Sequence, residues 1–381
     1  MHIFSLAPLL LVTFFIFSGC SSTEDSKENL SHEVDFTNSV ILGKALFQDK
    51  DLSFARSMSC ASCHSLDRAM TDDREAATIG ASLGDDENSL GDRNAQMVTY
   101  ASFSPKFSSI KNIAFRGGQF WDGRAMDLVE QAKGPFLNEI EMQMPDVSSV
   151  VIRIMEKESY VTAFKKFYGE DVFDTDEGAF EAVAQAIADY ESSPEVSTFD
   201  SKFDKSEKGE ILSTDLERHG ESLFISSGCS TCHVYRNADK SPSLFTSYAY
   251  QNIGVPQNSA LRLINGVSST YIDKGLANRE EYNETYQEGL FKIPSLRNVA
   301  VTAPYTHNGV FKTLKAMVHF YNTRDVVGAI NPDTNMPWEP SEVMQNRFNG
   351  IGDLKLSSQD EDAIIAFLKT LTDARYEPLL K

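Results

Sequence analysis

Beyond residue 17 the sequence lacks any apolar run long enough to cross a bilayer. Positive charge is also scarce: 35 lysines and arginines stand against 55 aspartates and glutamates, so the formal net charge is −20. A surface this acidic disfavours nucleic acid and anionic membranes and favours basic or neutral partners. Few segments alternate apolar and polar residues as strands do. With 41% hydrophobic residues to build a core, the composition predicts a mainly α-helical globular protein.

Cysteine is scarce too, with five in the whole chain, and four of them occur in one repeated pattern. The pattern is Cys60-Ala-Ser-Cys63-His64 in the first half and Cys229-Ser-Thr-Cys232-His233 in the second. Two thiols at this spacing can add to the two vinyl groups of one porphyrin, and the adjacent histidine then reaches the iron. A zinc ribbon needs no histidine after each cysteine pair, and a thioredoxin-like site would occur only once. The sequence therefore predicts two covalently attached haem c groups.

The N-terminus has the features of an export signal. An apolar run from Ala7 to Phe17 is followed by small residues and then Cys20, which resembles the lipobox of bacterial lipoproteins. We expect residues 1–20 to be a signal peptide with lipidation at Cys20, and an ordinary secretory signal is the alternative. Residues 21–37 are polar and acidic and read as a flexible tether. The expected location is the periplasm, with the protein anchored to a bacterial membrane only through lipid.

The two halves of the chain repeat each other weakly. At about 150 residues per domain, 381 residues suggest two domains. The segment GKALF (residues 43–47) precedes the first motif, GESLF (residues 220–224) precedes the second, and each half ends in a segment with helical apolar spacing. Such a pair of helices encloses the porphyrin in a cytochrome c domain. We expect two cytochrome c-like helical domains with long loops, 38–200 and 201–381, joined where Pro194 breaks a helix.

Further segments carry a resemblance to a known family. They are Phe120 to Ala125 (FWDGRA), Gln131-Ala132, Gly134-Pro135, Asn138 to Met142, Pro294 to Val299 (PSLRNV), Thr302 to Gly309 (TAPYTHNG) and Ala366 to Leu371 (AFLKTL). As a set they resemble the bacterial di-haem cytochrome c peroxidase family, which includes MauG. The resemblance covers nearly all of residues 38–375.

The resemblance implies that the first haem, with His64 as its proximal ligand, is the peroxidatic one. Many peroxidases of the family close its other side with a histidine on a loop, but Ala81 occupies that position here. None of the seven histidines lies between residues 65 and 218, so we expect a five-coordinate or water-bound iron. By the same resemblance Glu141 is the acid–base group and Gln131 hydrogen-bonds the bound peroxide. Without the resemblance, Glu141 would be interpreted as a surface charge and Gln131 as an amide on the face of a helix.

Tryptophan occurs only twice. The resemblance assigns Trp121 as the electron-transfer bridge between the two porphyrins, and core packing is the alternative. Trp338 matches no family motif and reads as packing or as part of a rim.

The axial ligands of the second iron are His233 and, by resemblance, Tyr321. Peroxidases of the family carry methionine at that position, whereas MauG-type members carry tyrosine. A thioether favours ferrous iron, while a phenolate is hard and anionic and favours ferric or higher states. Met317, one helical turn before Tyr321, and His319 remain open alternatives, as does the absence of any of the three.

The resemblance also implies one calcium ion at the domain interface. Its protein ligands would be the Asn94 side chain and the backbone carbonyls of Thr302 and Pro304, which are hard oxygen donors. An asparagine in a turn and an ordinary loop are the alternative explanations. His307 belongs to the same matched loop and receives no role.

Three functions compete at this level. The first, which we favour as the broad description, is hydrogen peroxide reduction with electrons from a small cytochrome c or cupredoxin. The second is a MauG-like oxidase that oxidises side chains of a partner protein. Ala81 and Tyr321 favour this function, since they imply an open first iron and a phenolate ligand on the second. The third is a pure electron carrier, against which an open first iron and Glu141 both argue. A homodimer is compatible with all three.

Overall fold

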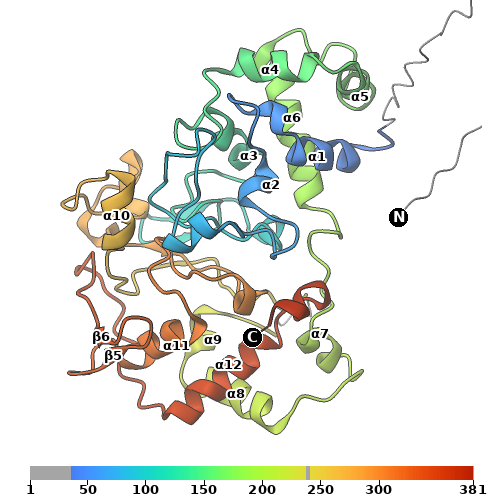
Figure 1. Cartoon of the computed structure of the whole chain (residues 1–381). Coiled ribbons are helices and arrows are strands. Elements are labelled where there is room, and N and C mark those ends of the chain that lie inside the picture. Colours follow the sequence, from blue (N-terminus) through green and yellow to red (C-terminus); the bar gives the residue numbers. More distant parts are fainter. Residues whose placement is uncertain (1–35, 237–240, 381) are drawn as a thin grey trace, which may run out of the picture. The chain divides into compact units, whose positions relative to one another are not determined.

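The computed structural model describes residues 36–236 and 241–380, and these belong to one compact unit (Figure 1). Helices and loops dominate, and the strands of the described part form three two-stranded pairs, so the predicted mainly α fold is confirmed. The expected signal peptide, the expected lipidation site Cys20 and the expected tether up to residue 35 lie outside the described residues. Within the described ranges, no helix has both the length and the apolar character needed to cross a membrane.

The N-terminal half is built around the crossing of its first and last helices. Its helices are α1 (Ser39–Gln48), α2 (Cys60–Cys63), α3 (Leu128–Leu137), α4 (Val147–Met155), α5 (Glu158–Tyr168) and α6 (Asp176–Glu191). Helix α1 packs on α6 at Gly43, where a Cβ atom would lie only 1.8 Å from the backbone oxygen of Ala186. Phe47, one turn further along α1, is fully buried and packs edge-on against Tyr190. The glycine therefore permits the close approach that lets both helices enclose the space beside α2.

The C-terminal half repeats this construction. Its helices are α7 (Lys202–Glu207), α8 (Asp215–Ser226), α9 (Cys229–Cys232), α10 (Ser259–Asn265), α11 (Leu314–Thr323) and α12 (Ser358–Lys369). Helix α8 crosses α12 at Gly220, whose Cβ would lie 1.9 Å from the oxygen of Ala363, and Phe224 is buried one turn later. The weak repeat seen in the sequence thus marks the same glycine-mediated helix crossing in both halves.

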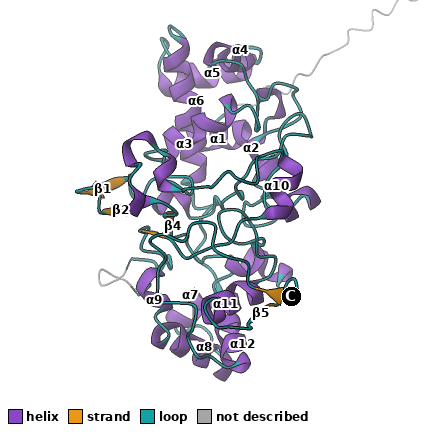
Figure 2. Cartoon of the chain, turned by 90° about the vertical axis from the view of Figure 1, so that its left-hand side faces the viewer, coloured by secondary structure: helices purple, strands orange, loops and turns teal. Residues whose placement is uncertain are grey.

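Loops fill most of the remaining chain, as Figure 2 shows between the helices of the two halves. The antiparallel pairs are β1 (Ser108–Ile110) with β2 (Ala114–Arg116), β3 (Tyr250–Gln251) with β4 (Phe291–Lys292), and β5 (Ile330–Asn331) with β6 (Met336–Pro337). Short 3₁₀ turns are η1 (Lys50–Leu52), η2 (Glu75–Ile79), η3 (Ala101–Phe103), η4 (Leu276–Asn278), η5 (Glu280–Tyr282), η6 (Thr285–Gln287), η7 (Val299–Val301) and η8 (Ala374–Leu379). Such loop-rich stretches are expected where a cofactor replaces part of the core.

Buried polar contacts join the two halves. The Tyr100 hydroxyl donates to Asp373 at 2.6 Å, and Asn298 donates to the other oxygen of the same carboxylate at 2.8 Å. Arg93 binds Asp273 with two bonds of 2.7 Å each. Bidentate arginine–carboxylate pairs fix orientation as well as distance. These contacts therefore fix the position of the facing loops of the two halves relative to each other.

Candidate haem centres

The first cavity, of about 190 Å³, is built beside α2. Cys60, Cys63 and His64 all line it, because α2 is a single helical turn that places both thiols and the following imidazole on one side. Nδ1 of His64 lies 3.1 Å from the backbone oxygen of Met70. With the Nδ1 proton donated to that carbonyl, Nε2 keeps its lone pair for a metal.

The second cavity, of about 410 Å³, repeats these features beside α9. Cys229, Cys232 and His233 line it, and Nδ1 of His233 lies 3.0 Å from the backbone oxygen of Phe245. Burial lowers the pKa of both imidazoles, to about 4 for His233, so both rings are neutral and able to bind iron.

The donor groups fit one haem in each half and exclude the competing metal site. The two cysteine pairs line different cavities, so they do not converge on one ion as a zinc ribbon requires. In residues 36–236 and 241–380, no three histidine, cysteine, aspartate or glutamate side chains are grouped to hold a metal ion. Each cavity instead offers two thiols and the imidazole that follows them, beside an apolar space, which is the set that a covalently attached porphyrin uses. The second cavity is lined by a further imidazole, that of His307.

Glu141 and Gln131 both line the first cavity, together with His64. Gln131 is placed there by α3, and Glu141 by the turn that follows it. Burial raises the pKa of the Glu141 carboxyl, while the positive charge of Arg124 and a 2.9 Å hydrogen bond from Asn138 act in the opposite direction. A carboxyl with a raised pKa beside an open metal position is suited to accept and return a proton.

Ala81, the position at which the sequence offers no distal histidine, is buried beside the first cavity. Ala81 is 1% exposed, and its neighbour Ser82 lines the cavity. His64 is the one histidine among the described residues that line this space. Three methionines, Met58, Met97 and Met142, are also in the wall.

This arrangement predicts the ferric state of the first iron. We expect a high-spin, five-coordinate or water-bound centre that binds cyanide without prior reduction, because no second imidazole is available to it. Paramagnetic resonance of the oxidised protein, before and after cyanide, measures this directly. A low-spin signal for that iron before cyanide, from bis-histidine or histidine–methionine ligation, would refute the prediction.

Trp121 lies where a bridge between the centres would have to lie. Its side chain lines both cavities. The indole Nε1 donates to the backbone oxygen of Asn94 at 2.9 Å, and the backbone oxygen of Trp121 accepts from the amide of Lys292 at 2.8 Å. The N-terminal half thus holds the indole, and the C-terminal half holds the backbone of the same residue.

Helix α11 presents two of the three candidate ligands to the second cavity. Tyr321 and Met317 both line it, one turn apart. His319 does not: its Nδ1 lies 2.7 Å from Oε1 of Glu361, on the side that faces α12. In this conformation His319 therefore lies outside the second cavity, and Tyr321, Met317 and the absence of a ligand from α11 remain the alternatives. Burial raises the pKa of the Tyr321 phenol, so it stays protonated unless a metal binds it.

The expected calcium ligands converge on one small space. Asn94, Thr302 and Pro304 all line the pocket between the two haem cavities. Nδ2 of Asn94 donates to the backbone oxygen of Pro304 at 2.8 Å. An oxygen-seeking cation would require the amide to turn so that Oδ1 faces the site. His307 is buried in the wall of the second cavity and stacked on Phe291 with 3.6 Å between ring centroids. Its Nε2 has no hydrogen-bond partner among the described residues and lies 4.0 Å from Oε2 of Glu342.

Several buried charged residues beside the two cavities could not be identified from the sequence. Arg93, which also binds Asp122 at 2.6 Å, lines the first cavity. Lys292 is 6% exposed, donates to the backbone oxygen of Gly118, and burial lowers its pKa to about 7. Glu191 lies in the wall of the first cavity. None of these three residues belongs to a recognisable sequence motif, so only a prediction of burial could have identified them.

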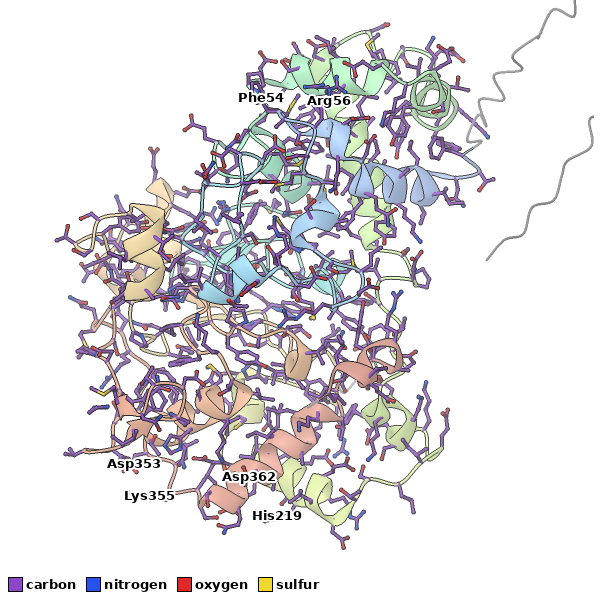
Figure 3. The ribbon with its side chains drawn as sticks, in the orientation of Figure 1. Phe54, Arg56, His219, Asp353, Lys355 and Asp362 are labelled. Atoms are coloured by element: carbon purple, nitrogen blue, oxygen red, sulfur yellow. The ribbon has the colours of Figure 1, made fainter. Side chains whose placement is uncertain are left out.

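His219, the histidine of α8, lies away from both cavities. His219, labelled in Figure 3, is on the outer side of α8 and pairs with Asp360 at 3.1 Å. It is not a candidate ligand.

Comparisons with known proteins agree with this geometry. The family model described as di-haem cytochrome c peroxidase matches residues 37–211. The methylamine utilization protein MauG of Paracoccus denitrificans is 44% identical over 89% of this chain and 90% of its own length. The chain belongs to the di-haem cytochrome c peroxidase and MauG family. It is therefore a peroxidase-type oxidoreductase with two haem c groups.

Other relatives in the family support the same assignment. Cytochrome c551 peroxidase of Nitrosomonas europaea is 33% identical over 87% of this chain and 79% of that protein. The crystal structure of the di-haem peroxidase BthA from Burkholderia thailandensis superimposes with a TM-score of 0.81 at 30% identity, covering 91% of this chain and 89% of that one. The fold is thus shared with a di-haem peroxidase of known structure.

Proposed function

We propose that this protein reduces hydrogen peroxide at the N-terminal haem, with electrons passed through the C-terminal haem. The observation that supports this most is the first cavity itself. It combines Glu141, Gln131 and a single imidazole, that of His64. An electron carrier needs neither an open metal position nor a buried acid–base group beside it.

The chain's own residues have distinct tasks in this reaction. Two haems would supply the redox chemistry, with His64 holding the iron of the first and His233 that of the second. Glu141 takes the proton from the inner oxygen of peroxide and returns it to the outer oxygen, which leaves as water. The Gln131 amide would donate a hydrogen bond to the peroxide. Trp121 carries the electrons between the centres. Two electrons and two protons convert one peroxide into two waters.

A MauG-like oxidation of a partner protein is the second candidate. It is favoured by Tyr321 in the wall of the second cavity and by Ala81 in place of a loop histidine. A phenolate ligand disfavours the ferrous state, so the second haem would store oxidising equivalents rather than relay electrons at high potential. The oxidised groups would then be side chains of that partner.

Steady-state kinetics with a reduced small cytochrome c as electron donor separate the candidates. If the proposal is right, we expect sustained peroxide turnover that saturates with the donor. A slow reaction that leaves a long-lived form oxidised by two electrons would favour the MauG-like reading. If peroxide does not react at all, both are wrong and the protein is an electron carrier.

The setting of the reaction is part of the proposal. We place the protein in the periplasm, tethered by lipid at Cys20. One calcium ion would be held by Asn94, Thr302 and Pro304, where oxygen atoms of both halves meet. The net charge of −20 favours a basic electron donor, whether a small cytochrome c or a cupredoxin. The chain works alone or as a homodimer.

A further inference from the structure

Glu191, the last residue of α6, is a buried carboxyl that the proposed reaction does not use. It is 4% exposed and lines the first cavity together with Cys60. Its Oε2 has no hydrogen-bond partner among the described residues. Buried carboxylates are normally paired or hydrogen-bonded, so an unpaired one in a cofactor cavity points to a function.

Cations on the helices around α6 do not neutralise Glu191. Lys44 of α1 binds Glu195 at 2.6 Å, and Lys133 of α3 binds Glu181 and Glu130, each at 2.6 Å. Arg153 of α4 donates to the backbone oxygen of Phe54. In the described part of the chain, each of these cations therefore has another partner.

The wall of the same cavity also contains two cations, Arg93 and Arg124, and both pair with Asp122. The other titratable groups around Glu191 are the Cys60 thiol, the buried Tyr190 hydroxyl and, across the cavity, the Glu141 carboxyl and the neutral His64 imidazole. Haem attachment converts the thiol into an uncharged thioether. Because desolvation acts unopposed, the pKa of Glu191 rises to about 8. The carboxyl is thus neutral at pH 7, unlike an ordinary glutamate.

We propose that Glu191 is the redox-linked proton site of the N-terminal haem: it holds a proton when that iron is reduced and releases it when the iron loses an electron. In the balanced step, the electron passes to a one-electron acceptor and the carboxyl proton passes to water, and both return on reduction. The net charge of the cavity then stays constant. This inference needs only the haem of the first half and is independent of which proposed reaction the protein performs.

The physical basis is mutual electrostatic coupling. Oxidation adds one positive charge to a low-dielectric cavity and so favours the ionised carboxylate. By linkage, ionised Glu191 favours the oxidised iron. The reduction potential of this haem should therefore fall as pH rises through the titration of Glu191. The ferric-to-ferrous equilibrium should change by up to about tenfold for each pH unit.

The test is a spectroelectrochemical titration of the N-terminal haem in the intact di-haem protein, at pH values on both sides of 8. Four proteins are compared: the wild type, Glu191→Gln, Glu141→Gln and Glu181→Gln. The last is a matched control, since Glu181 is on the same helix but 56% exposed and paired with Lys133. We expect Glu191→Gln to lose most of the pH dependence, and the other two to keep it.

The same pH dependence in Glu191→Gln and the wild type would overturn the inference. So would its loss in Glu141→Gln alone, which would assign the proton to the other carboxyl. If Glu191→Gln does not accumulate as a haem protein, reduced-minus-oxidised infrared spectra of the wild type decide instead. A protonated-carboxyl band present only in the reduced state, and shifted in Glu191→Asp, supports the inference, and its absence contradicts it. Peroxide turnover does not enter either measurement, so the proposed function can fail separately.

Discussion

Replacing Glu141 with glutamine is expected to slow peroxide turnover by roughly 10²–10⁴-fold, the usual contribution of a positioned acid–base group. Glutamine keeps the shape of the side chain and its contact with Asn138 but cannot accept and return a proton. Haem content should be unchanged, because covalent attachment of the haem does not involve Glu141. Pre-steady-state mixing of the protein with peroxide, followed by absorbance, measures the effect.

The pH dependence gives an independent check on Glu141. Burial holds its pKa above the usual range of a glutamate. Only the ionised form can take the first proton, so wild-type activity should fall as pH is lowered through this raised pKa. The acidic limb should vanish in Glu141→Gln. A suitable control is Glu139→Gln, an exposed carboxyl two residues away. Equal activity of Glu141→Gln and the control would assign the proton transfer to another group.

The second large effect is expected at Tyr321. Replacement by methionine should raise the reduction potential of the C-terminal haem by a few tenths of a volt, since axial ligands tune haem potentials over roughly 0.8 V. A soft thioether stabilises ferrous iron, whereas a phenolate stabilises ferric iron. Potentiometric titration and the thioether-to-ferric absorption band report the change. With this ligand the protein should also turn over peroxide more like an electron-fed peroxidase.

The alternative ligand on the same helix provides the control for Tyr321. Met317 also lines the second cavity, one turn away. If Tyr321 is the ligand, Met317→Leu should leave the spectrum and potential nearly unchanged, while Tyr321→Phe should change both. A thioether band in the wild type that persists in Tyr321→Phe and disappears in Met317→Leu would instead assign the methionine.

Much of the fold could be predicted because its signals are local. The repeated five-residue segments GKALF and GESLF marked α1 and α8. The structure shows why they repeat: Gly43 and Gly220 allow the helix crossings. The loop-rich stretches followed from the absence of periodic apolar patterns. The roles of Glu141, Gln131 and Trp121 rested on resemblance, since each residue alone reads as surface or core. The structure brings all three to the first cavity, and their roles stay predictions.

Other features depended on residues far apart in the chain. The sequence left Tyr321, Met317 and His319 open, and only the contact of His319 with Glu361 removed one of them. Nothing local pairs Arg93 with Asp273, which meet only when the two halves fold together. The buried state of Glu191 likewise follows from where α6 ends against the cavity.

By itself the sequence determined that this protein binds two haem c groups, because thioether attachment needs only two thiols and a histidine within one helical turn. The tertiary structure alone decided which charges are buried beside those haems and which of them have partners. The physical reason is that covalent attachment is a matter of spacing along the chain, whereas desolvation and charge compensation depend on every segment that packs around a site.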